Sequence, residues 1–150
     1  MTDLPEQIAS LLIPMQGRPL LVPNAAVAEI VNWPELEQIA ETPSWLLGMT
    51  EWRGIQLPVV SLERLNDPAA DDAEGHRLLV INSQGHYKSP FYGVAAQGIP
   101  RLIRVFPEEI GEQQDLVDDQ VFDMLVMVSG ERAIIPDLMA VEDYLSQITR

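Results

Sequence analysis

Apolar and polar residues alternate over short stretches along most of this chain. The run IQLPVV at 55–60 is one example, and its period of two is typical of a strand with one buried face. Proline and glycine separate such runs at short intervals, which favours short strands over long helices. We expect strands at 11–16, 19–22, 29–33, 48–53, 55–60, 77–82, 90–95, 101–106, 122–128 and 132–135.

Helical spacing is clear only near the end of the chain. There, apolar residues recur at intervals of three and four and form one face, which consists of Leu138, Val141, Leu145 and Ile148. Asp137 precedes this run and is the predicted N-cap. The spacing predicts a helix over 137–148 that packs on the strands.

Two parts of the chain repeat one order of elements. Residues 11–31 and 78–105 each contain a strand, a Gln-Gly turn, a second strand and an Ala/Val-rich stretch. Residues 53–65 and 131–145 each contain a turn, an apolar strand, a proline and a Leu-rich helical segment. This order indicates two copies of a five-strand unit, and five strands that close on themselves leave no exposed edge. We predict an all-β fold of two small five-stranded SH3-like β-barrels, packed side by side, with a C-terminal α-helix.

We expect a single domain over residues 1–150, and the repeat predicts that it is divided into two barrel subdomains. The first barrel is expected at 10–66 together with the helix at 137–148, and the second at 76–135. Between them, residues 66–75 (NDPAADDAEG) have the composition of a linker, and the acidic stretch 107–120 predicts a solvated loop. Pro58 falls inside a strand pattern and is therefore expected at a sheet edge or a bulge.

Arg53 and Gly54 lie between two of the expected strands. Glycine tolerates the positive φ that a tight hairpin requires, so the pair predicts a reversal of the chain. Basic residues are scarce, with 9 against 23 acidic ones and a net charge of −14. A cation held at a hairpin tip is therefore a candidate recognition group, although an isolated Arg-Gly pair is more often a solvated turn.

Charge and composition narrow the classes of function. The net charge of −14 repels phosphates and anionic lipids, so nucleic acids and membrane surfaces are not expected partners. The absence of cysteine excludes disulfides and thiolate chemistry. No signal-peptide pattern opens the chain, and no apolar run approaches the roughly 18 residues of a membrane span. We therefore expect a cytoplasmic protein.

The chain has none of the common catalytic motifs, such as a nucleophile elbow, a phosphate-binding glycine-rich loop or a zinc-protease pair of histidines. His76 and His86 lie in turn-like sequence without an evident third metal ligand, and Asp71, Asp72 and Glu74 indicate a flexible acidic loop. We predict a protein that is not an enzyme and that binds no cofactor or metal.

Residues 46–65 (LLGMTEWRGIQLPVVSLERL) resemble the CheW-like chemotaxis coupling domain. They contain its glycine, short strand, Arg-Gly pair, Pro-Val-Val and Leu-rich turn. Residues 20–31 (LLVPNAAVAEIV) are similar to its strand and Val-x-Glu-Ile segment, and 78–105 and 134–145 occupy its second-half positions. The resemblance covers roughly residues 10 to 147.

The resemblance implies two five-stranded β-barrels and a non-catalytic adaptor that couples chemoreceptors to a histidine kinase. The implied partners are the regulatory domain of the kinase and the cytoplasmic tip of a receptor. The family motifs and the residue beside the Arg-Gly pair give the expected partner-binding residues, which are Val27, Glu29, Gly48, Trp52, Arg53 and Gly54. The resemblance also implies that Glu29 pairs with Arg53.

The chain departs from the family pattern at several positions. Glu51-Trp52 stands where Asn-Leu is common, Ser61 stands where aspartate is common, and 95–98 (AAQG) lacks an expected acid. These departures would suit a specialised pathway, such as one that controls pilus-based motility. Two other hypotheses are a generic small β-barrel that binds peptides or assists an enzyme, and a small hydrolase that uses the unassigned carboxylates.

Overall fold

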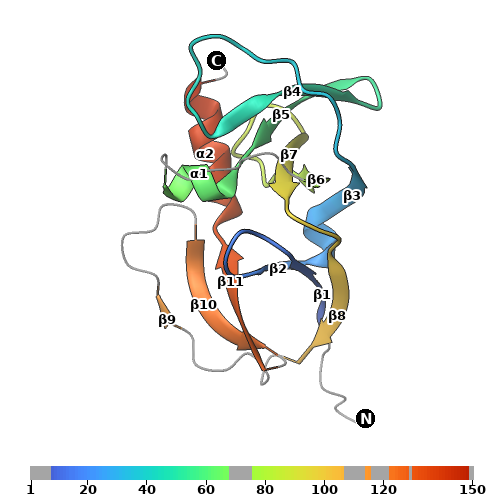
Figure 1. Cartoon of the computed structure of the whole chain (residues 1–150), viewed down its shortest axis with the longest axis vertical. Coiled ribbons are helices and arrows are strands. Elements are labelled where there is room, and N and C mark those ends of the chain that lie inside the picture. The colour runs from blue at the N-terminus through green and yellow to red at the C-terminus, as the bar shows by residue number, and fades with distance from the viewer. Residues whose placement is uncertain (1–7, 68–75, 107–113, 116–121, 129, 149–150) are drawn as a thin grey trace.

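Two mixed β-sheets occupy the lower and upper halves of Figure 1. The computed structural model describes residues 8–67, 76–106, 114–115, 122–128 and 130–148. The lower sheet contains, in spatial order, β8 (Arg101–Val105), β1 (Ile8–Ile13), β2 (Leu20–Pro23), β11 (Glu131–Pro136), β10 (Phe122–Val128) and β9 (Gln114–Asp115). The upper sheet contains β3 (Val27–Asn32), β6 (Arg77–Asn82), β7 (Phe91–Ala96), β5 (Ile55–Val60) and β4 (Leu46–Trp52).

Three helices complete the described elements, namely the 3-10 turn η1 (Asn24–Ala26), the short α1 (Leu62–Asn66) and α2 (Leu138–Ile148). The predicted fold class is confirmed, since each sheet has five strands once the two-residue β9 is set aside and α2 follows the last strand. Each expected strand is present with ends shifted by a few residues. The predicted N-cap is also confirmed, because the Asp137 Oδ1 accepts a hydrogen bond from the Ala140 amide at 3.1 Å.

The sheets do not follow the boundaries that the internal repeat predicted. The upper sheet takes β3–β7, whereas the lower sheet combines β1 and β2 with β8–β11. The reason is pairing between distant strands: β1 pairs with β8, as at Leu11 and Leu102, and β2 meets β11 in parallel at Leu20 and Ile134. The division at 66–76 is therefore wrong for the sheets, because the chain leaves the lower sheet after β2 and returns to it at β8.

The acidic stretch 107–120 was expected to be a solvated loop. Its residues Gln114 and Asp115 instead pair with β10, so the prediction is wrong for these two positions. The other residues of this stretch, and residues 68–75 of the expected linker, lie outside the described residues.

The main core lies between the two sheets and α2. Strand β1 buries both of its faces, because Leu11 and Ile13 contribute to this core while Leu12 belongs to a second, smaller cluster in the lower sheet. Val141 and Leu145 of α2 are fully buried in the main core. The helix thus covers apolar residues of both sheets, and it does so with Val141 and Leu145 of its predicted apolar face.

A buried carboxylate fixes α2 on the turn between β6 and β7. Glu142 is 0% exposed and accepts hydrogen bonds from the Ser83 hydroxyl at 2.9 Å, the Gln84 amide at 2.7 Å and the His86 amide at 2.9 Å. The next turn of the helix adds a bond from the Ser146 hydroxyl to the His86 carbonyl at 2.6 Å. Because α2 continues directly from β11, this contact links the lower sheet to a turn of the upper sheet (Figure 1).

Gly48 of β4 allows a second close approach. An added Cβ at this position would lie 2.7 Å from the Glu37 carbonyl oxygen, and φ is +151°. The backbone of Glu37 forms a two-way bridge with Met49, with N···O distances of 2.8 Å and 2.9 Å. Gly48 therefore lets the segment that joins β3 to β4 lie on β4.

We expect Glu142→Ala to lower the free energy of unfolding by about 3 kcal/mol, because it empties a fully buried position and removes the acceptor of three hydrogen bonds that fix α2 on the turn. Urea denaturation measures this change. Gln147→Ala, at an exposed position of the same helix, is the matched control and should change stability by no more than about 0.5 kcal/mol. Equal stability of Glu142→Ala and the control would contradict the assignment.

Gly48→Ala should lower the free energy of unfolding by about 2 kcal/mol, since the new methyl group meets backbone that cannot move away. Gly17→Ala is the control. Gly17 also has a positive φ, +96°, but an added Cβ would meet nothing within 4 Å. Its loss should be limited to the backbone cost of about 1 kcal/mol, and an equal loss in both variants would show that the contact with Glu37 is unimportant.

Candidate partner-binding site

Arg53 and Gly54 form the two-residue turn between β4 and β5. Trp52 and Ile55 pair on either side, and φ is positive at both turn residues, +49° at Arg53 and +78° at Gly54. This is the pattern of a type I′ hairpin, so the predicted reversal is confirmed. A non-glycine residue in this region costs about 1 kcal/mol, and the Arg53 side chain remains 69% exposed. The turn therefore holds a cation in solvent on a rigid support.

One carboxylate oxygen accepts three side-chain hydrogen bonds at this tip. The Oε1 atom of Glu29, on β3, accepts hydrogen bonds from Trp52 Nε1 at 2.9 Å, Arg53 Nε at 3.2 Å and Arg53 Nη2 at 3.0 Å. The implied pairing of Glu29 with Arg53 is thus confirmed. Trp52 is an additional donor that the sequence did not reveal.

This contact joins the two edges of the upper sheet. Strands β3 and β4 lie at opposite ends of its hydrogen-bonding order, yet Glu29 on β3 reaches the last residue of β4 and the turn after it. In Figure 1 the tip of the β4–β5 hairpin lies on the same side of the molecule as β3, higher in the view. The side-chain bonds bring the sheet edges together where the backbone does not.

The Arg53 guanidinium lies over an aromatic ring that itself packs against a second one. The Arg53 Cζ lies 5.2 Å from the centroid of the Trp52 ring, and Trp52 meets Phe91 edge to face with centroids 4.9 Å apart. Such cation–π and aromatic contacts each contribute on the order of 1 kcal/mol. We call Glu29, Trp52, Arg53 and Phe91 the hairpin-tip cluster. Phe91 was not predicted, since a single aromatic residue at the start of a strand gives no periodic signal.

The other expected site residues have different surroundings. Gly54 is exposed at the tip, with nothing within 4 Å of an added Cβ. Val27, the first residue of β3, is half-buried and packs against the main core. Gly48 is buried below the segment that contains Glu37. The structure thus brings Glu29, Trp52, Arg53 and Gly54 together, and it places Val27 and Gly48 where they support β3 and β4.

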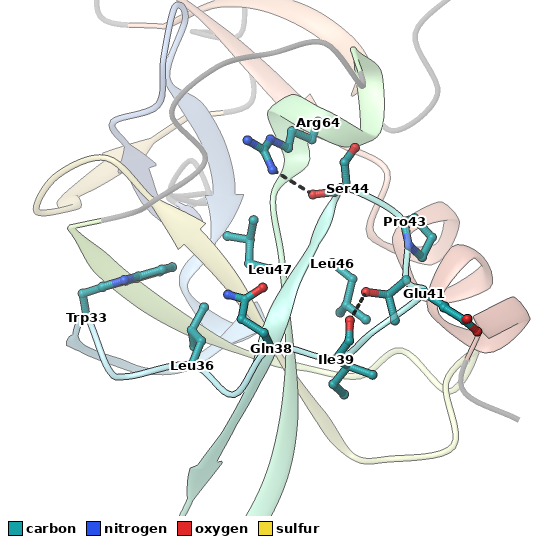
Figure 2. A pocket seen from close by; sticks show the side chains of 11 residues that line it. Trp33, Leu36, Gln38, Ile39, Glu41, Pro43, Ser44, Leu46, Leu47 and Arg64 are labelled. Atoms are coloured by element: carbon teal, nitrogen blue, oxygen red, sulfur yellow. Dashed lines mark hydrogen bonds between the residues drawn. The ribbon is translucent and has the colours of Figure 1, made fainter.

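A groove of about 320 Å³ lies beside β4, away from the hairpin tip. Figure 2 shows its walls, which come from the segment between β3 and β4, from β4 itself and from α1. Trp33 lines one side, and Arg64 donates a hydrogen bond from Nη1 to the Ser44 carbonyl at 3.1 Å on another. Trp45, by contrast, is buried against Tyr144 of α2. Trp33 therefore lies in the groove, Trp45 in the core and Trp52 at the hairpin tip.

The described residues include no group of three or more His, Cys, Asp or Glu side chains that could hold a metal ion. Within the same residues, no helix has the length and apolar character needed to cross a membrane.

The hydrogen bonds to Glu29 predict its titration. The Arg53 guanidinium, followed by the Trp52 indole, holds the pKa of the Glu29 carboxyl below its ordinary value of 4.5. Because the pKa is lowered in the folded state, the stabilisation is present above the ordinary value and is lost as the pH falls through the lowered one. Titration followed by carboxyl NMR should show a higher Glu29 pKa in Arg53→Met than in wild type. An unchanged pKa would contradict the pairing.

Comparison with known proteins supports a single family. No curated protein sequence gives a significant match. The structure is similar to the crystal structure of the scaffolding protein TtCheW from Thermoanaerobacter tengcongensis, with a TM-score of 0.73 and 16% sequence identity. The alignment covers 92% of this chain and 89% of that one, and at this identity it establishes a shared fold. The family model of the CheW-like domain matches residues 9–144. The chain therefore belongs to the CheW-like domain family.

Proposed function

We propose that this chain is a non-catalytic adaptor of the cytoplasm that couples chemoreceptors to a chemotaxis-type histidine kinase. The observation that carries the proposal is the match of residues 9–144 to the CheW-like domain, a family of signalling scaffolds. Its proposed partners are the kinase regulatory domain and the cytoplasmic tip of a receptor. Both are proteins, in keeping with a net charge of −14 that disfavours nucleic acid and anionic membranes.

We assign partner binding to the hairpin-tip cluster together with Gly54. Arginine and aromatic residues dominate the energetics of protein interfaces, and here they lie next to one another. Glu29 and Trp52 already restrict the Arg53 side chain, so binding loses less side-chain freedom than with an unrestrained arginine. Gly54 leaves open space next to the guanidinium. Val27 and Gly48 serve the site by supporting the strands that carry it.

The test is affinity for the two partner fragments from the same organism, the kinase regulatory domain and the receptor tip. Arg53→Glu should weaken binding to at least one of them by about tenfold or more, because it places a second carboxylate beside Glu29. Arg101→Glu is the matched control, since Arg101 is also exposed, at 65%, and paired with a glutamate, Glu131, at 3.1 Å. It lies on the lower sheet and should change affinity by no more than about twofold.

Two results would contradict the proposal in different ways. If wild type binds neither fragment, the chain is not an adaptor between these proteins. If wild type binds and Arg53→Glu binds equally well, the adaptor role stands and the hairpin tip is not its binding surface. Thermal unfolding of both variants, compared with wild type, separates a lost contact from a lost fold.

A further inference from the structure

The hydrogen bonds of the hairpin-tip cluster are distributed unevenly. All three donors, two from Arg53 and one from Trp52, bond to the same oxygen of Glu29, Oε1. Within the part of the chain that the structure describes, Glu29 Oε2 accepts no hydrogen bond and Arg53 Nη1 donates none. One acceptor and one donor group of the cluster are therefore left for another molecule.

Both groups belong to accessible side chains, since 69% of the Arg53 side chain and 36% of the Glu29 side chain remain exposed. The Nε and Nη2 atoms form one edge of the planar guanidinium, and that edge faces Glu29. The end of the group, where Nη1 and Nη2 each carry outward N–H bonds, is open to a carbonyl oxygen. Glu29 Oε2, on the carboxylate beside it, is open to an N–H donor.

Charge decides which partner group fits this pair. A carboxylate could accept from the guanidinium, but it would lie beside Glu29 on a chain with a net charge of −14, and it offers no donor to Oε2. An ammonium or guanidinium group could donate to Oε2, but it has no acceptor and is repelled by Arg53. A carboxamide is neutral and carries a carbonyl oxygen and an N–H donor in one plane.

We propose that the hairpin tip recognises a neutral carboxamide, the side chain of an Asn or Gln on the partner protein. The carbonyl oxygen accepts from the end of the Arg53 guanidinium, and the amide N–H donates to Glu29 Oε2. Trp52 is the positioning residue, because its indole N–H donates to Oε1 and the Arg53 Cζ lies over its ring, 5.2 Å from the centroid. The proposal rests on the proposed function, and it deepens it by naming the group that the tip binds.

The experiment is a double-mutant cycle with the fragment, kinase regulatory domain or receptor tip, that wild type binds and Arg53→Glu releases. Each surface Asn and Gln of that fragment is changed to Ala, and each surface Asp and Glu likewise. Affinities are measured against wild type and Arg53→Met. We expect one Asn or Gln to show coupling of about tenfold with Arg53. The same residue should also couple to Glu29→Gln. A glutamine amide has only one oxygen, and when that oxygen keeps the three donors of Oε1, a nitrogen donor takes the place of the acceptor Oε2.

Salt provides a second readout. For a neutral partner group, the ratio of wild-type to Arg53→Met affinity should stay within about twofold between about 50 mM and about 500 mM NaCl. Coupling to an Asp or Glu, with a ratio that falls as salt increases, would overturn the proposal in favour of a carboxylate. Coupling to none of these residues would overturn it as well. Failure of wild type to bind either fragment would instead refute the proposed function.

Discussion

The fold depends on the buried carboxylate of Glu142. Its three donors come from one turn of the upper sheet, while the helix that carries it continues from β11 of the lower sheet. A buried polar group is tolerated when it is hydrogen-bonded, and two of these donors are backbone amides whose positions the turn fixes. The orientation of α2 on both sheets is therefore specified by polar geometry as well as by apolar burial.

Glu29 uses the same chemistry at the surface. It also receives three donors, but two of them come from an exposed arginine and the third from a half-buried indole. An exposed ion pair of this kind adds little to stability. Its effect is positional, since it joins β3 to the end of β4 and limits the freedom of the Arg53 side chain. One carboxylate thus fixes α2 on a turn of the upper sheet, and the other restrains Arg53, the proposed recognition group.

Much of the fold could be predicted from the sequence, because strands and tight turns are local. The run at 55–60 and the Arg53-Gly54 pair identified the hairpin by periodicity and by the φ preference of glycine. The grouping of strands into sheets could not be predicted from the order of elements. It depends on pairings such as Leu11 with Leu102, between residues far apart in the chain, and the internal repeat suggested a different division.

The candidate site was only partly visible in the sequence. Arg53 and Glu29 could be found from the family motif, whereas Phe91 and the indole donor of Trp52 required the folded structure. Glu142 could have been recognised, because it lies four residues after Leu138 and next to Val141 on the apolar face of the helix. A charged residue on such a face is a signal of a buried polar contact.

The central claim is that Trp52, Arg53 and Glu29 form the surface that meets a partner. The indole N–H signals of the three tryptophans test it most directly, since Trp52 is bonded to Glu29, Trp45 is buried against Tyr144 and Trp33 lines the separate groove. In an NMR titration with the kinase regulatory domain or the receptor tip, the account predicts a large shift of the Trp52 signal while Trp45 stays unchanged. A shift of Trp33 with an unchanged Trp52 would contradict it and would place the partner in the groove.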